Sequence, residues 1–257
     1  MNDKRKNEID ENIIEGRNAI VEAMKTGKTI ESILIQKGTV GQSINKLIAL
    51  AKDKKIVIKE VDKQKLNNMS DTGMHQGVIA ITTPYNYSEP EEILEYARSK
   101  GENPFIIILD EIEDPHNFGS IVRTAEICGV HGIIIPKRRN VGVTPTVYRA
   151  SVGAVEHVKI AKVTNINTYI DQLKEQGVWI YGADMHGKDF CYDVKFDGAI
   201  ALVIGSEGRG ISKLTLNKCD VLVKIPMIGK INSLNASVAG GILMYEVLRQ
   251  KLISGRK

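Results

Sequence analysis

The chain has 257 residues, of which 42% are hydrophobic and 26% charged, a balance typical of a folded globular protein. Its net charge of +4 suits a polyanionic partner such as nucleic acid but does not require one. The N-terminus is polar and no run of about 18 apolar residues follows, so we expect neither a secretion signal nor a membrane span. Three cysteines without a C-x-x-C pair indicate no disulfide framework and no zinc site, which favours a cytoplasmic protein.

The first third of the chain is predicted to form a small α/β domain over residues 13–81, after a flexible tail over 1–12. Helical spacing of apolar residues occurs near 20–24 and 44–51, and short apolar runs at 33–35, 56–58 and 77–81 are typical of strands. Pro84 and Pro90 then interrupt any regular element. We therefore expect a linker over 82–103 that contains a short helix at 91–99.

The remaining residues, 104–257, alternate between strand patterns and helix patterns. Strands are predicted at 105–109, 132–135, 178–181, 199–204 and 221–225, and helices at 121–128, 166–175 and 236–252. Apolar strands separated by helices indicate a parallel sheet that is covered on both faces. Ligands bind such sheets beyond the carboxyl ends of the strands, so we expect the functional residues in the loops that follow the strands.

The first such loop follows residues 105–109 and carries two candidate functional side chains. Asn117 could cap the next helix, and Arg123 could lie in the first or second turn of that helix, near the strand end, or on a solvated face. Both the structural and the functional interpretation of each residue stay open at this point.

The second loop, Gly205-Ser206-Glu207-Gly208-Arg209-Gly210, contains three glycines that permit close approach of backbone to a ligand or a tight turn. Its spacing is neither the dinucleotide pattern G-x-G-x-x-G nor the phosphate loop G-x-x-x-x-G-K-[ST]. The spacing therefore disfavours a nicotinamide-dependent or nucleotide triphosphate-dependent enzyme.

The third loop precedes the final helix, which Ser233 or Asn235 could cap. Gly240 and Gly241 lie inside that helix, where each costs about 1 kcal/mol relative to alanine. We infer that close packing against a ligand loop or another helix requires the small volume.

Taken in order, the three loops read D-x-x-x-D-P-x-N-x-G-x-x-x-R-T-A, G-x-E-G-x-G and I-P-M-x-G-x-x-x-S-L-N-A-S-V-A. This succession over residues 109–246 resembles the three motifs of the SpoU family of RNA ribose 2′-O-methyltransferases, within the SPOUT superfamily. Residues 14–20 and 74–78 are similar to segments of the bacterial branch that modifies a guanosine in the peptidyl-transferase P loop of 23S rRNA. His75 and Gln76 could equally form a polar turn before a strand.

The resemblance implies a fold and a cofactor. The C-terminal domain is expected to thread a trefoil knot, and the N-terminal domain to resemble small RNA-binding ribosomal proteins. S-adenosylmethionine is the implied methyl donor, held largely by backbone groups of Gly205, Ile225 and Leu234 beside a loop that Gly208 shapes. The family needs no metal, and it forms homodimers through the C-terminal domain.

The resemblance also implies catalytic roles. A ribose hydroxyl is a poor nucleophile at neutral pH, so its proton must be accepted or its developing charge stabilised. Arg123 matches the arginine often assigned to that task. Because a guanidinium rarely gives up a proton, we expect Arg123 to bind a phosphate and to stabilise the developing negative charge. Asn117, Glu207, Ser233 and Asn235 are implied to position the ribose and to brace Arg123 and the loops.

Three alternatives remain beside the guanosine of 23S rRNA. Ala236 and Lys159 stand where the family often has valine and the rRNA branch often has proline, which leaves room for another rRNA loop. A tRNA could be the substrate, although family members that act on tRNA tend to lack a separate N-terminal domain. A ribosome-assembly or RNA-binding protein without catalysis is the remaining possibility.

Overall fold

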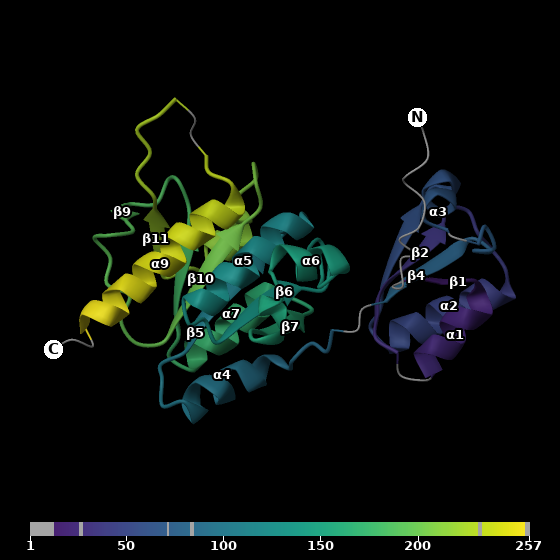
Figure 1. Cartoon of the computed structure of the whole chain (residues 1–257), viewed down its shortest axis with the longest axis horizontal. Helices are drawn as coiled ribbons and strands as arrows, with labels where there is room; N and C mark the ends of the chain where they lie inside the picture. The colour runs from purple at the N-terminus through teal and green to yellow at the C-terminus, as the bar shows by residue number, and fades with distance from the viewer. Residues whose placement is uncertain (1–12, 26–27, 71, 83–84, 231–232, 255–257) are drawn as a thin grey trace. The chain divides into compact units, whose positions relative to one another are not determined.

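The computed structural model describes residues 13–25, 28–70, 72–82, 85–230 and 233–254. The expected tail over 1–12 lies outside these residues. The chain divides into two compact units between Asn86 and Tyr87, and each unit has its own sheet (Figure 1). The short helix expected within 82–103 is α4 (Pro90–Ser99), which packs on the second unit.

The first unit is a four-stranded sheet in the order β1-β4-β2-β3, with helices α1 and α2 packed on one face. Its helices α1 and α2 bury Ile20, Met24, Ile44 and Leu47 in the core, as their spacing predicted. The sequence did not predict β1, which has three residues, or α3, which buries only Leu66. The elements are β1 (Ile13–Glu15), α1 (Arg17–Lys25), β2 (Ile30–Gln36), α2 (Gln42–Asp53), β3 (Val57–Val61), α3 (Lys63–Met69) and β4 (Val78–Thr82).

The two N-terminal segments that the sequence singled out meet in space. Arg17 Nε donates to the Gln76 carbonyl oxygen at 3.2 Å, and the Arg17 backbone N–H donates to Gln76 Oε1 at 3.4 Å. His75 is buried, its Nδ1 accepts from Gly77 N–H at 3.0 Å, and its Nε2 lies 2.9 Å from Asn67 Oδ1. His75 is therefore more than a polar turn residue, because it ties the turn before β4 to α3.

The second unit is built on a seven-stranded sheet in the order β7-β6-β5-β10-β8-β11-β9, and every pairing is parallel. This confirms the predicted parallel sheet. The strands are β5 (Phe105–Asp110), β6 (Gly132–Pro136), β7 (Lys159–Val163), β8 (Trp179–Ala183), β9 (Asp189–Phe190), β10 (Ile200–Gly205) and β11 (Val221–Lys224). The sequence did not predict β7, which mixes lysines with apolar residues, or the two-residue β9.

Helices cover both faces of this sheet, as predicted (Figure 1). Helices α4 and α7 pack on one face against alternate strand residues such as Ile106, Ile108 and Val203. On the other face α5 contacts α6 and α9, and Gly240 of α9 lets the helix lie against Ile204 of β10. The remaining helices are α5 (Pro115–Ile127), α6 (Pro145–Ala150), the 3-10 helix η1 (Ala154–Glu156), α7 (Ile166–Glu175), α8 (Lys213–Leu216) and α9 (Ala236–Ser254).

Helix α5 begins six residues earlier than the sequence analysis expected. The Asp114 side chain caps it by accepting from His116 N–H at 2.9 Å, and Pro115 occupies the first helical position. An aspartate followed by proline is a common start of a helix, so this signal was available in the sequence. Asn117 is consequently a first-turn residue rather than the cap, and Arg123 lies in the third turn rather than near the strand end.

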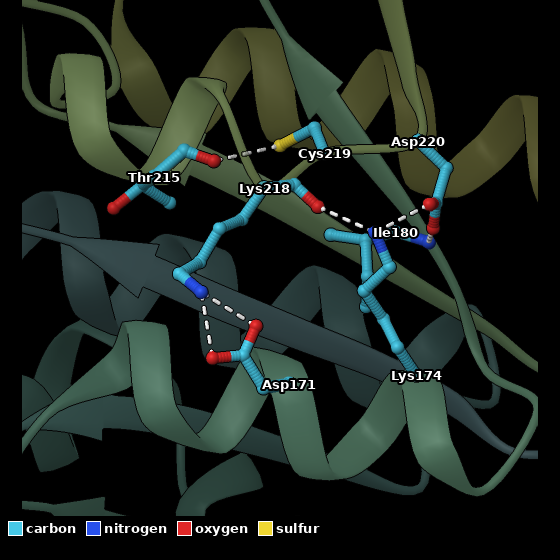
Figure 2. Close-up of polar contacts among 7 residues, drawn as sticks. All are labelled: Asp171, Lys174, Ile180, Thr215, Lys218, Cys219 and Asp220. Atoms are coloured by element: carbon cyan, nitrogen blue, oxygen red, sulfur yellow. Dashed lines mark hydrogen bonds and ion pairs between the residues drawn. The ribbon is translucent and has the colours of Figure 1, made fainter.

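Polar contacts fix the start of β11, the strand that leads to the third loop (Figure 2). Asp220 Oδ2 accepts from Ile180 N–H at 2.9 Å, and the carboxylate pairs with Lys174 at 2.6 Å. Beside it, the Cys219 thiol donates to the Thr215 carbonyl at 3.3 Å, and burial raises the pKa of that thiol to about 12. The thiol is therefore neutral and structural, and β11 starts from a fixed position.

Candidate active site

The glycine loop that follows β10 is closed upon itself. Ser206 and Gly210 exchange two backbone hydrogen bonds, of 3.1 and 2.9 Å. A Cβ atom at Gly205 would lie 2.1 Å from the Gly210 carbonyl carbon, and Gly208 has a φ of +83°, which side chains rarely adopt. Glycine is therefore required at both positions to form a loop this tight.

The loop presents Glu207, whose Oε1 atom accepts hydrogen bonds from two other segments. Asn117 Nδ2 of α5 donates at 2.9 Å, Asn235 Nδ2 also donates, and the Ala236 backbone N–H lies at 3.4 Å. Among the described residues, Glu207 Oε2 has no hydrogen-bonding partner. One carboxylate oxygen thus joins all three predicted loops, and the other is free to accept from a ligand.

Asn235 uses both ends of its amide. Its Oδ1 accepts from the Ser237 N–H at 2.9 Å and the Val238 N–H at 3.3 Å, so Asn235 caps α9. Its Nδ2 donates to Asn117 Oδ1 at 2.9 Å as well as to Glu207. Of the two cap candidates in the sequence, Asn235 is the one that makes these contacts, and the same residue links the helix to the glycine loop.

A cavity of about 320 Å³ lies at the carboxyl ends of β8, β10 and β11. This is within the range of about 300–1,000 Å³ that is typical of small-ligand pockets. It brings together Ser233, Glu207 and the four residues expected to hold the methyl donor, Gly205, Gly208, Ile225 and Leu234. Its lining includes apolar side chains, backbone of the glycine loop and the carboxylates of Asp184 and Glu207. Apolar walls suit the aromatic base of the donor, and carboxylates suit its positively charged sulfonium.

The cavity also contains residues that sequence reasoning missed. Asp184, Met185 and His186 follow β8 and line the cavity from that side. The sequence predicted β8 but not its place between β10 and β11, because strand order is not encoded in local patterns. Knowing that order would have identified the loop after β8 as part of the site.

A second cavity of about 270 Å³ adjoins the first, and the two share Ser206, Glu207, Arg209 and Ala236. Asn117 lines only this second cavity, together with residues 111–114. Glu207 therefore borders both spaces. Such an arrangement can hold two ligands side by side with one carboxylate between them.

Arg123 is not part of this cluster. Its side chain is exposed on α5, it lines neither cavity, and within the described part of the chain it makes no hydrogen bond or ion pair. The structure thus joins Asn117, Glu207 and Asn235 to one another and leaves Arg123 apart from them.

Two further properties bear on function. None of the helices that the structure describes is long and apolar enough to cross a membrane. In the same described ranges, no cluster of three His, Cys, Asp or Glu residues could hold a metal ion.

Comparison with known proteins decides the family. Residues 104–245 match the SpoU rRNA Methylase family, and residues 13–88 match the domain described as RNA 2′-O ribose methyltransferase substrate binding. The chain belongs to the SpoU rRNA methylase family. It is therefore an S-adenosylmethionine-dependent RNA methyltransferase, which confirms the enzyme class and the methyl donor that the sequence predicted.

Individual relatives span nearly the whole chain. The Bacillus subtilis protein described as putative TrmH family tRNA/rRNA methyltransferase YacO is 47% identical and covers 92% of this chain and 94% of itself. A Staphylococcus aureus protein with the same family description is 46% identical over 95% of this chain and 98% of its own. The structure of the SpoU methyltransferase AviRb from Streptomyces viridochromogenes with AdoMet has a TM-score of 0.60 at 24% identity and covers 94% of this chain and 90% of AviRb.

The two roles of Asn235 can be separated by substitution. Asn235→Ser keeps a good helix cap but removes the amide that donates to Glu207, so we expect turnover lowered at least about tenfold and a loss of unfolding free energy of about 1.5–3 kcal/mol from the missing bond to the carboxylate. Asn235→Ala loses both roles and should lose about 1 kcal/mol more than the serine variant. Denaturant titration and methyl-transfer assays measure the two effects; full turnover in the serine variant would show that the amide contacts are dispensable.

Proposed function

We propose that this enzyme transfers a methyl group from S-adenosylmethionine to the ribose 2′-hydroxyl of a guanosine in the P loop of 23S rRNA. The observation that carries the ribose assignment is the match of residues 13–88 to a substrate-binding domain of RNA 2′-O ribose methyltransferases. The choice of the P loop rests on the similarity of residues 14–20 and 74–78 to that branch of the family. The first unit, in this proposal, binds rRNA as small ribosomal proteins do.

The lengths of the structural relatives favour rRNA over tRNA. A structure described by its 2′-OH methylation of C/U34 on tRNA covers 60% of this chain but 98% of its own, and the A. aeolicus TrmH/SpoU tRNA modifying enzyme covers 64% of this chain. A structure described as an rRNA methyltransferase from Sinorhizobium meliloti with AdoMet covers 93% of this chain. An rRNA substrate accounts for the additional N-terminal unit, and tRNA is the second candidate.

The two adjoining cavities support a division of labour. S-adenosylmethionine supplies an electrophilic methyl group when it is bound. In the larger cavity Gly205, Ile225 and Leu234 would hold the donor, while Gly208 permits the tight loop. In the smaller cavity Asn117 and the free Glu207 Oε2 would orient the ribose. Ser233, which is exposed at the edge of the larger cavity, would contact the ribose from that side.

Arg123 is proposed to bind a phosphate beside the target ribose and to stabilise the negative charge that develops on the attacking oxygen. Its exposure and its lack of partners among the described residues leave the guanidinium available for this task. In the transfer, the ribose oxygen would bond to the methyl carbon as the donor's carbon–sulfur bond breaks, and the hydroxyl proton would pass to solvent or to a neighbouring acceptor. A guanidinium stabilises the charge without giving up its own proton.

Arg123→Lys tests this role. Lysine keeps the charge but not the planar donor pair, so we expect kcat to fall by at least about tenfold while the affinity for S-adenosylmethionine is unchanged. Steady-state kinetics and calorimetry measure the two quantities. Near-normal turnover with unchanged RNA affinity would rule out a bidentate contact.

We also propose that the enzyme forms a homodimer through the second unit. A groove of about 730 Å³ lies between α5 and α9 and has a mainly apolar lining. Contiguous exposed apolar surface of this kind marks an interface, and a second copy of the chain would cover it symmetrically. Five large side chains in the groove are each at least 40% exposed, namely Ile127, Tyr192, Val238, Ile242 and Tyr245.

A charge in this groove should separate the subunits. Ile242→Asp places a carboxylate at the centre of the proposed interface, and sedimentation equilibrium is expected to give a monomer because a buried unpaired charge is strongly unfavourable. Leu252→Asp lies on the same helix but outside the groove, and it should remain dimeric. If both variants sediment as the unmodified protein does, the interface lies elsewhere.

The trefoil knot and a cytoplasmic location complete the proposal. The knot is supported by the strand order, because β10 pairs with both β5 and β8 while the chain after β11 returns to place α9 against β10. An experimental density map traced through residues 225–236 would test it.

A location in the cytoplasm follows from rRNA as substrate, and fractionation of cells that express a tagged chain would test it.

The substrate is tested most cleanly in cells. Mass spectrometry of rRNA and tRNA from matched strains with and without the gene should reveal loss of one 2′-O-methylguanosine from the P loop of 23S rRNA in the deletion strain. Restoring the gene should restore the modification. Intact rRNA together with an altered tRNA would contradict the proposal and favour the second candidate.

A further inference from the structure

Two arginines from separate loops converge on one carboxylate next to the smaller cavity. Arg139 Nη1 donates to Glu111 Oε1 at 3.0 Å, and Arg209 Nη1 lies 3.7 Å from Glu111 Oε2. The arginine side chains are 77% and 85% exposed, whereas that of Glu111 is 22% exposed. Most of the guanidinium N–H groups therefore face solvent, and these three side chains together carry one net positive charge beside a cavity that Glu113, Asp114 and Glu207 also line.

The backbone of both Glu111 and Arg139 lies in the same strained region of φ. Glu111 has a φ of +63° and Arg139 a φ of +58°, the left-handed region that is uncommon for residues other than glycine. Strain of this kind persists only where the surroundings impose it, and it gathers at functional sites. Here the two strained residues are the ones that pair with each other.

Hydrogen bonds between the two loops hold that backbone in place. Asn140 Oδ1 accepts from Ile112 N–H at 2.8 Å, and Val141 N–H donates to the Ile112 carbonyl at 2.8 Å. Ile112 directly follows Glu111, and Asn140 and Val141 directly follow Arg139, so these bonds join the two loops beside the ion pair. The backbone that carries Arg139 is thus fixed relative to the end of β5.

The cluster is continuous with the site. Glu111 and Arg209 line the smaller cavity with Asn117 and Glu207, and Arg209 also lines the larger one. A ligand that reaches Asn117 and Glu207 therefore has this pair of guanidiniums at its edge. Arg139 is hydrogen-bonded to Glu111 and Arg209 lies within ion-pair distance of it. Two exposed guanidiniums so placed suit a phosphodiester, whose oxygens accept charge-assisted hydrogen bonds.

We propose that Arg139 and Arg209 form a clamp for a backbone phosphate of the RNA next to the target nucleotide, and that Glu111 is the positioning residue that holds the two guanidiniums in place. The inference rests on the proposed RNA substrate and adds to it a contact that is separate from Arg123. The phosphate uses the solvent-facing N–H groups, so the pairs with Glu111 can remain intact.

The test uses the full-length protein and a P-loop stem-loop transcript. Arg139→Gln and Arg209→Gln should each weaken RNA binding on the order of tenfold and lower the slope of log affinity against log salt by about 0.7 to 0.9. Arg98→Gln is the matched control, because it removes the same charge from an exposed side chain that donates to Gln176, the residue at the C-terminal end of α7. The control should change affinity less than twofold.

Glu111→Gln separates positioning from charge. Glutamine keeps an oxygen that can accept from Arg139 but loses the negative charge that attracts Arg209. RNA affinity should therefore stay equal or rise, while kcat falls several-fold because Arg209 is no longer held. Calorimetry with S-adenosylmethionine should give affinities within twofold of the unmodified protein for the Arg98, Glu111 and Arg139 variants, whose changed residues do not line the larger cavity.

Equal losses of RNA affinity in the Arg98 variant and in the Arg139 and Arg209 variants would overturn the clamp. The clamp would also be overturned if the Arg209 variant lost affinity for S-adenosylmethionine instead of for RNA. An unchanged kcat in Glu111→Gln would overturn the positioning role. If the unmodified protein methylates no RNA, the proposed function fails, but the affinity and salt comparison still tests the clamp.

Discussion

The convergence of hydrogen bonds on Glu207 Oε1 is the interaction on which the site depends. It connects the first turn of α5, the glycine loop after β10 and the start of α9, which are far apart in the sequence. A carboxylate oxygen can accept from several donors at once, and each bond to a charged acceptor contributes about 1.5–3 kcal/mol. Without this acceptor the glycine loop would lose its side-chain hydrogen bonds to α5 and to the start of α9.

The constraints around Glu207 explain why small residues surround it. The loop can turn tightly only because Gly205 allows backbone contact with Gly210, and α9 can approach β10 only because Gly240 leaves room for Ile204. These glycines lose more conformational entropy on folding than other residues would. In return, the shape of the cavity is set by backbone rather than by mobile side chains. A fixed cavity of this kind favours orientation of both reactants before the transfer.

Much of this arrangement could be predicted from the sequence, because local patterns carry local structure. The parallel sheet, the loops at its carboxyl edge and a helix cap at Ser233 or Asn235 all follow from apolar runs, glycines and cap chemistry. What could not be predicted depends on contacts distant in sequence. The loop after β8 joins the cavity because of strand order, and Arg139 meets Glu111 because two loops hydrogen-bond across the sheet edge. Arg123 is a different case, since the resemblance assigns it a role while the single chain leaves it apart from the cluster.

The role of Glu207 as the shared acceptor is tested most directly by comparing two substitutions by calorimetry. Glu207→Gln keeps an oxygen that can accept from Asn117 and Asn235, so S-adenosylmethionine should bind with an affinity within a few-fold of that of the unmodified protein. Glu207→Ala removes the acceptor, so the affinity should fall at least about tenfold although the protein remains folded. Unchanged donor affinity in the alanine variant would contradict the account.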